Sequence, residues 1–342
     1  MHPCHVLTRY GQAQGRTILD GTRKQWLIYK SSGYSGGMAL GLSGGIPIGL
    51  VYALLSMAGY GSYLVFAKSA TARHGSVVAS TAIHGIGLLL IAAMASRYLY
   101  VPSIALLGLI IATGLIGAAG VYLQFLAVQV GDIAIVSPLS NMGGFFILLL
   151  GVVFLGERYS GVVYAGAVVV LLGVLLALVR GPAVQASDTG RGDGRVKHGR
   201  FGGRVITPGA LPAVGFSLIL ALYGTLSKMV VDELGGIVSA FWLELAVLLW
   251  LLPFAVRAMM QLERRDVRPL FIAGLLFGIG SGFLYPAIGL IGLGLTGSII
   301  QAAPIIGVTL AYVLLKERLA KWQWVGVLCT IAGMLAIVVA SA

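Results

Sequence analysis

Charged residues are scarce in this chain, at 10% of its 342 residues, against about 25% in an ordinary soluble domain. Hydrophobic residues reach 58% and the mean hydropathy is +0.97. A soluble protein of this composition would lack the polar surface needed to cover its core, so a soluble globular enzyme is excluded. Cysteine is also rare. Cys4 and Cys329 are the two cysteines of the chain, and they form neither a disulfide framework nor a metal-binding spacing.

Enzyme motifs are missing as well. The sequence contains no Walker A motif, no HExxH zinc motif, no nucleophile elbow and no dinucleotide-binding fingerprint. We therefore expect no catalytic residues, no cofactor and no metal site.

A secretory signal needs a short apolar segment followed by a small-residue cleavage site, and residues 1–45 carry neither.

Long apolar runs are the dominant feature after residue 45. Each is long enough to cross the ~30 Å of hydrocarbon in a bilayer as a helix. Only helices and closed barrels satisfy the backbone within lipid, and these runs lack the alternation of barrel strands. The sequence predicts an all-α, multi-pass protein of the plasma membrane with ten transmembrane helices. The ten runs are 46–67, 76–96, 103–128, 132–155, 160–179, 210–231, 236–256, 269–290, 295–315 and 321–341.

Two polar segments interrupt this pattern. Residues 1–45 are basic and Gly-rich, and we expect a disordered tail; Met38 is an alternative start, which would remove residues 1–37. Residues 180–209 are Gly-rich with six Lys and Arg, a composition typical of a flexible linker. We interpret the Arg-Gly-Asp at 191–193 as coincidence. The linker divides the spans into halves 46–179 and 210–342.

The two halves resemble each other. Aligning Glu157 with Glu317 places eight identities within 27 ungapped positions. Shared hydrophobicity readily matches Leu with Leu, but not a charged pair together with two glycines. Each half has five runs, an odd number, so the second half is inverted relative to the first in the membrane. Inverted repeats are typical of secondary transporters. The most informative matches are Glu157-Arg158 with Glu317-Arg318, Gly166 with Gly326, and Gly173 with Gly333.

A known family carries the same pattern. Segment 131–179 contains GDIAIVSPLS and LGERYSGVVYAGAVVVLLGVLLAL, and segment 294–339 contains GLTGSIIQAAPIIGVTLAYVLLKERLAKWQW. Both resemble the repeat of the EamA-type transporters of the drug/metabolite transporter superfamily. The resemblance implies ten helices in two inverted five-helix repeats around a cavity lined mainly by helices 1, 3, 4, 6, 8 and 9. Family members usually break a helix with proline before the corner glutamate, as at Pro304, whereas the first half has Gly144.

Neutral polar and aromatic side chains occupy these cavity helices. Together they would form an amphipathic pocket, with rings supplying contact area and amides fixing orientation. Individually, each could equally bond one helix to another. Asn141 and Gln301 are favoured because each lies beside a helix break, where freed backbone groups can face a ligand. The candidate substrate-binding residues are Tyr60, Tyr63, Tyr122, Gln124, Ser140, Asn141, Tyr223, Thr225, Ser281, Tyr285 and Gln301.

Glu244 and His84 are ionisable residues placed deep within spans, in helices 7 and 2. A charged side chain at the bilayer centre costs about 2.5–3.5 kcal/mol on insertion scales. Both are candidate coupling groups for a proton or ion, and the alternative is a hydrogen-bonded residue packed between helices. The first span carries no acid between 46 and 67, unlike the small multidrug antiporters, in which a helix-1 glutamate exchanges protons for drugs.

Charge distribution predicts orientation. Eight Lys and Arg lie on the side of the two termini and fifteen on the side of the linker. By the positive-inside rule the linker is cytoplasmic and both termini are outside. The net charge of +12 is then explained by an anionic membrane surface, and we expect no nucleic-acid partner.

These features together predict a secondary transporter. It would move a small polar or amphipathic metabolite, such as an amino acid or a related compound, by alternating access. We expect the lipid bilayer and a small-molecule substrate as partners, possible coupling to a proton or ion, and a monomer or homodimer. A non-transporting receptor-like or scaffold protein is the alternative, and it would have no solute-accessible cavity. An intramembrane enzyme would need paired catalytic groups, for which only His84 and Glu244 qualify.

Overall fold

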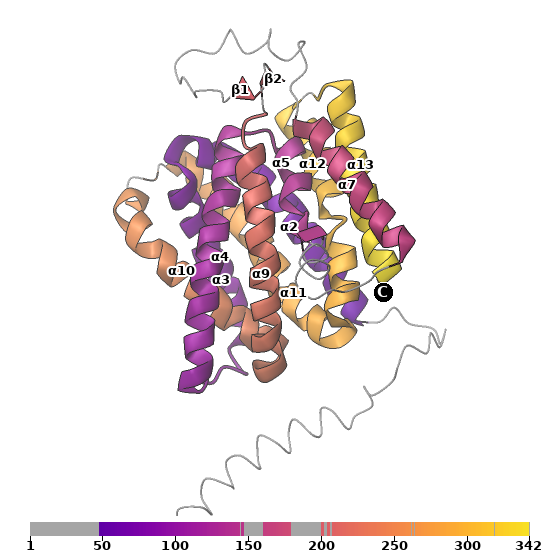
Figure 1. The fold of residues 1–342 in the computed structure, drawn as a ribbon. Coiled ribbons are helices and arrows are strands. Elements are labelled where there is room, and N and C mark those ends of the chain that lie inside the picture. The colour runs from indigo at the N-terminus through magenta and orange to yellow at the C-terminus, as the bar shows by residue number, and fades with distance from the viewer. Residues whose placement is uncertain are drawn as a thin grey trace, which may run out of the picture. The chain divides into compact units, whose positions relative to one another are not determined.

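The helices of the first half are α2 (Ile48–His74), α3 (Ser76–Ala95), α4 (Ile104–Val130), α5 (Ile133–Ser140) and α7 (Gly161–Leu178). Those of the second half are α9 (Ala210–Leu234), α10 (Gly236–Met259), α11 (Arg264–Ile300), α12 (Ala303–Leu310), the π-helical turn η2 (Ala311–Leu315) and α13 (Lys321–Ser341) (Figure 1). Between them, strands β1 (Arg200–Phe201) and β2 (Arg204–Val205) form an antiparallel ribbon.

This computed structural model describes residues 48–143, 145–146, 160–178, 200–201, 204–205, 207–260, 262, 264–317 and 319–341, all within the unit Pro47–Ala342. Predictions for the tail 1–45, Gly144, the Glu157-Arg158 corner and most of the linker 180–209 fall outside the described residues.

Six of the described helices are long and apolar enough to cross a membrane. They are α2, α3, α4, α9, α10 and the part of α11 from Arg264 to Ile291. The α-helical, multi-pass architecture is therefore confirmed. The count of ten spans stays a prediction, because α7, α12 with η2, and α13 are shorter apolar helices.

The division between the eighth and ninth predicted spans is wrong. We expected a break between 290 and 295, but α11 continues to Ile300 and the turn falls at Gln301 and Ala302. Apolar residues and glycine between 291 and 295 do not stop a helix that is buried in protein or lipid. Pro304 lies in the first turn of α12, where its missing N–H costs nothing and its fixed φ favours a new helix.

Matching turns confirm the internal repeat. Gly75 separates α2 from α3 with φ 85° and ψ 167°, and Gly235 separates α9 from α10 with φ 77° and ψ 164°. A residue with a Cβ rarely adopts this conformation, so both halves use glycine for the same turn. The turn at Asn141 and Met142 likewise matches its repeat-equivalent, the turn at Gln301 and Ala302.

Packing between the halves follows an approximate two-fold axis. Helices α7 and α13 lie side by side (Figure 1). A Cβ added to Gly166 would lie 3.1 Å from the Gly333 carbonyl oxygen, and one added to Gly173 would lie 2.7 Å from the Gly326 carbonyl oxygen. Since Gly166 is equivalent to Gly326 and Gly173 to Gly333, this crossed pairing requires antiparallel helices related by a two-fold axis. The same symmetry relates the pairs α2–α11 and α4–α9, and the pairs α3–α11 and α4–α10.

Ion pairs between helices gather at the end of the bundle from which α9 begins. Lys68, near the end of α2, pairs with Glu317 and lies 3.5 Å from Asp132, the residue before α5. Glu317 also accepts the backbone N–H groups of Ile133 and Ala134 at 3.1 and 2.9 Å. The corner glutamate therefore satisfies the N-terminus of α5 while it neutralises Lys68.

A second ionic contact lies at the same end. Asp266, in the first turn of α11, accepts from Arg73 and lies 2.6 Å from His74 Nε2. At the opposite end, the repeat-equivalent of Lys68 is Lys228, which pairs with Asp232 of the same helix at 2.7 Å. Within the described residues, ion pairs thus join different helices at the first end, whereas the ion pair at the other end lies within one helix.

Candidate functional site: a central cavity

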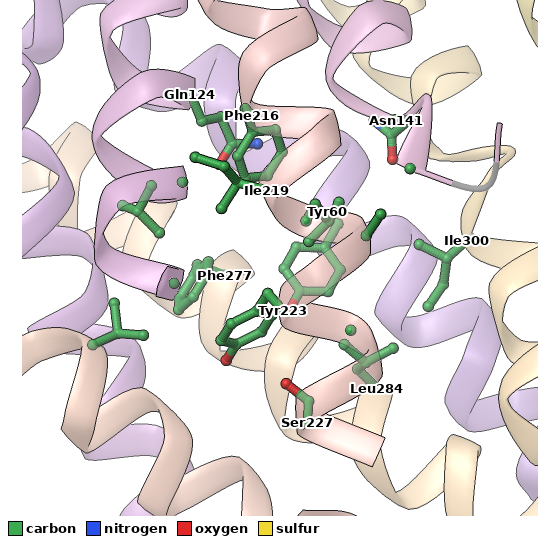
Figure 2. Close-up of a pocket in the computed structure, with 18 of the residues that line it drawn as sticks. Tyr60, Gln124, Asn141, Phe216, Ile219, Tyr223, Ser227, Phe277, Leu284 and Ile300 are labelled. Atoms are coloured by element: carbon green, nitrogen blue, oxygen red, sulfur yellow. The ribbon is translucent and has the colours of Figure 1, made fainter. Parts of the chain in front are cut away.

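A cavity of about 250 Å³ lies between the two repeats (Figure 2). A site for a single water needs only ~15 Å³, so the centre of the bundle is not packed solid. Residues from α2, α4, α5, α9 and α11 line the cavity, as do Gln301 in the turn before α12, His84 of α3 and Glu244 of α10. The family resemblance implies a lining mainly from helices 1, 3, 4, 6, 8 and 9, and the structure adds His84 of α3 and both Glu244 and Val247 of α10.

Most of the predicted substrate-binding residues meet at this cavity. Its lining includes Tyr60, Tyr63, Gln124, Asn141, Tyr223, Tyr285 and Gln301, together with both candidate coupling residues, His84 and Glu244.

Four predicted residues lie elsewhere. Tyr122 is 41% exposed on the outer surface of α4, and exposed Thr225 returns its hydroxyl to the Ala221 carbonyl at 3.1 Å. Ser140 is buried outside the lining. Ser281 is also buried, and it reaches the cavity indirectly through Glu244.

Aromatic rings form one wall of the cavity. The Phe277 ring centroid lies 4.2 Å from that of His84, 5.5 Å from that of Tyr63 and 5.9 Å from that of Tyr60. The rings of Tyr60, Tyr223 and Phe277 surround the same space in Figure 2. Sequence reasoning missed Phe277, because nothing in its local sequence distinguishes it from Phe271, which is 51% exposed on the same helix.

Two tyrosines at repeat-equivalent positions orient the polar part of the lining. The Tyr63 hydroxyl donates to Gln124 Oε1 at 2.8 Å, and the Tyr223 hydroxyl lies 3.0 Å from the Tyr285 hydroxyl. The alignment that places Glu157 on Glu317 also places Tyr63 of α2 on Tyr223 of α9. Each repeat therefore contributes one hydrogen-bonded tyrosine to the cavity from its first helix.

An ionisable pair lies among these rings. His84 Nδ1 is 2.9 Å from Glu244 Oε2, and Ser281 Oγ donates to Glu244 Oε1 at 2.7 Å. Both carboxylate oxygens therefore have partners. Glu244 is the only carboxylate among the described lining residues, and neither lysine nor arginine occurs there.

Three buried polar atoms of lining residues have no hydrogen-bond partner within the described structure. They are Ser227 Oγ, Thr296 Oγ1 and Gln301 Oε1. Buried polar atoms are rarely left unpaired, so these three are available to a solute or to water in the cavity. The helix break indicated Gln301 in the sequence, but no sequence signal pointed to Ser227 or Thr296.

The arrangement is suited to binding. Rings and aliphatic side chains offer apolar contact, while hydroxyl and amide groups offer hydrogen bonds at fixed places. The cavity volume of about 250 Å³ lies just below the ~300–1,000 Å³ range of small-molecule sites.

Comparisons with known proteins agree with the fold. A solved structure titled only "Crystal structure of protein" matches with a TM-score of 0.50 and 17% sequence identity, over 84% of this chain and 99% of that chain. At this identity the likeness concerns the fold alone. A search of curated proteins returned no match.

The sequence profile of the EamA-like transporter family matches residues 47–179 and again residues 207–339. The starts of the two matches, at 47 and 207, are offset by the same interval as Glu157 and Glu317 in the internal repeat, and together the matches cover most of the chain. The chain is an integral membrane protein that belongs to the EamA-like transporter family.

Proposed function

We propose that this protein is a secondary transporter that moves a small polar or amphipathic metabolite, such as an amino acid or a related compound, across the plasma membrane by alternating access. The observation that carries the proposal is the cavity between two inverted repeats, into which buried polar atoms without partners face. A passive scaffold has no need of such a space.

The difference between the two ends supports alternating access. Lys68, Glu317 and Asp132 link α2 to α5 and to the corner after η2, and Arg73 and His74 link α2 to α11. Two similar repeats joined by ion pairs at one end of the bundle are expected to have a second arrangement, in which the helices are joined at the other end and not at the first. Both arrangements would contain the same central cavity.

The chemistry of the lining supports the substrate class. Phe277 and four tyrosines would pack against an apolar portion of a solute, and Thr296 and Gln301 would bond a polar portion. The lining contains no Lys or Arg among its described residues, so a strongly anionic solute such as a phosphate ester is disfavoured.

Counterflow in liposomes tests the proposal. Purified protein is reconstituted into liposomes loaded with an unlabelled mixture of the standard amino acids, and a trace of the labelled mixture is added outside. We expect transient accumulation of label that is absent from protein-free liposomes. The same mixture should raise the melting temperature of the protein, because a ligand that binds only the folded state stabilises it.

The two readouts separate the possible failures. Stabilisation without flux would favour the non-transporting alternative, a receptor-like membrane protein. Absence of both stabilisation and flux would contradict the proposed substrate class.

A further inference from the structure

His84 and Glu244 meet at the centre of the bundle. His84 Nδ1 and Glu244 Oε2 are 2.9 Å apart, and their side chains are 4% and 5% exposed. An ionisable pair in the middle of a membrane protein is costly and is retained where it serves a purpose. Neither residue belongs to the ion pairs that fasten the end of the bundle.

The position of this pair follows from the repeat. The alignment that places Glu157 on Glu317 also places His84 on Glu244, so each is the equivalent of the other in its own repeat. Two equivalent residues can touch only if they lie at the axis that relates the repeats. A site on that axis is equally far from both ends of the bundle, and it keeps its place whichever end is open.

The surroundings leave the charge of Glu244 with few partners. The titratable groups that share the cavity with it are His84 from α3, Tyr60 and Tyr63 from α2, Tyr223 from α9 and Tyr285 from α11. Ser281 of α11 bonds the other carboxylate oxygen. Helix α4 contributes Gln124 and no charged group to the lining.

We propose that the His84–Glu244 pair carries the proton that couples transport to a pH gradient. This inference rests on the proposed function. With one proton the pair is neutral overall, either as imidazolium and carboxylate or as imidazole and carboxylic acid. Without that proton it has a net charge of −1, which is costly to enclose in a dry centre. The pair takes the proton from water on one side of the membrane and returns it to water on the other.

Access to the cavity distinguishes this pair from a structural one. Asp266, which pairs with Arg73 and His74, has a fully buried side chain at the end of the bundle and lies outside the cavity lining. His84 and Glu244 both line the cavity, so water that enters the cavity can reach them. A pair with only a structural role would gain nothing from this placement.

The test separates exchange from gradient-driven transport. Glu244→Gln keeps the size and hydrogen bonding of the side chain but cannot release a proton. The same labelled amino-acid mixture is used in two assays, counterflow at equal pH and accumulation driven by a pH gradient of each polarity. Glu233→Gln makes the same chemical change at an exposed acid on α9, outside the cavity, and is the matched control.

We expect the wild type and Glu233→Gln to perform both reactions. We expect Glu244→Gln to lose accumulation in response to the gradient, while its counterflow falls by a smaller factor. His84→Gln should behave in the same way, and it provides the test if Glu244→Gln does not fold.

Three other results would each refute a proposal. Counterflow in the wild type that ignores pH gradients, or a gradient response that survives both substitutions, would refute proton coupling by this pair and leave the transport function standing. Absence of counterflow in the wild type would refute the proposed function, and the coupling with it.

Discussion

The Thr296 hydroxyl is fully buried at the cavity without a hydrogen-bond partner. Leaving such a group unpaired costs about 1–3 kcal/mol. We expect Thr296→Val to keep or raise the melting temperature of the protein, since the substitution removes the unpaired atom and preserves the shape. If the hydroxyl contacts the solute, the same variant will lower the apparent affinity for the amino-acid mixture, measured from the concentration dependence of counterflow.

Thr113 provides the control for this prediction. Its hydroxyl is also fully buried without a partner, but it lies outside the cavity lining. Thr113→Val should change stability in the same direction and leave transport unaltered. Equal effects of the two substitutions on transport would contradict a contact between Thr296 and the solute.

Four positions that a helix break or an ionisable group marked in the sequence lie at the cavity, and their roles in binding and coupling stay predictions. Asn141, Gln301, His84 and Glu244 all line the cavity. Tyr122 and Thr225 do not, because apolar residues cover every side of these helices and their hydropathy does not show which face turns inward. For the same reason the sequence did not single out Phe277.

At the scale of helices, the close contact of α7 with α13 depends on glycine. A Cβ on Gly173 would lie 2.6 Å from the Thr330 backbone nitrogen, so the two helices would have to separate. We expect Gly173→Ala to lower the free energy of unfolding by roughly 1–3 kcal/mol, the usual cost of overpacking, as measured by thermal denaturation in detergent.

Gly108, within α4, is the matched control. A Cβ there would meet nothing within 4 Å, so Gly108→Ala should be neutral or stabilise by roughly 0.5–1 kcal/mol through backbone entropy. A Gly173 variant as stable as the Gly108 variant would show that the two helices do not pack as described.

The ion pair between Lys68 and Glu317 joins α2 to the corner before α13. The Glu317 side chain is 7% exposed, so solvent screens the pair only weakly. A double-mutant cycle of Lys68→Met and Glu317→Gln should give a coupling energy of about 0.5–3 kcal/mol in thermal unfolding.

The corresponding cycle at the other end uses Lys228→Met and Asp232→Asn, whose side chains are 39% and 58% exposed. It should give less than about 0.5 kcal/mol, because exposed pairs within one helix contribute little. Similar coupling energies at the two ends would contradict the conclusion that ion pairs join the helices more strongly at the end of Lys68 and Glu317 than at the other end.

Helix starts were predicted well after a glycine turn, at Ser76 and Gly236, although α2 continues to His74, beyond the predicted end at 67. The prediction failed within α11, because glycine in an apolar environment does not by itself end a helix. The break lies at Gln301 and Ala302, just before Pro304, and not at the glycines between 291 and 295.

For the whole molecule, the internal repeat was the most useful signal. The alignment of Glu157 with Glu317 predicted two equivalent halves, and the odd number of spans in each half predicted that they are inverted. The alignment did not predict that His84 and Glu244 are in contact, because equivalent positions in two repeats can lie at any distance from each other in space. The contact requires that the axis relating the repeats pass between α3 and α10. Only the packing of all the helices determines the position of that axis.

The most direct test of a cavity shared by two alternating openings is labelling of one cysteine from both sides of the membrane. Val121 lines the cavity on α4, and Val121→Cys would be made with Cys4→Ser and Cys329→Ala. A membrane-impermeant thiol reagent is applied to cells and, separately, to inside-out vesicles. We expect labelling from both sides, slowed in each case by the amino-acid mixture. Labelling from one side alone, or from neither, would contradict it.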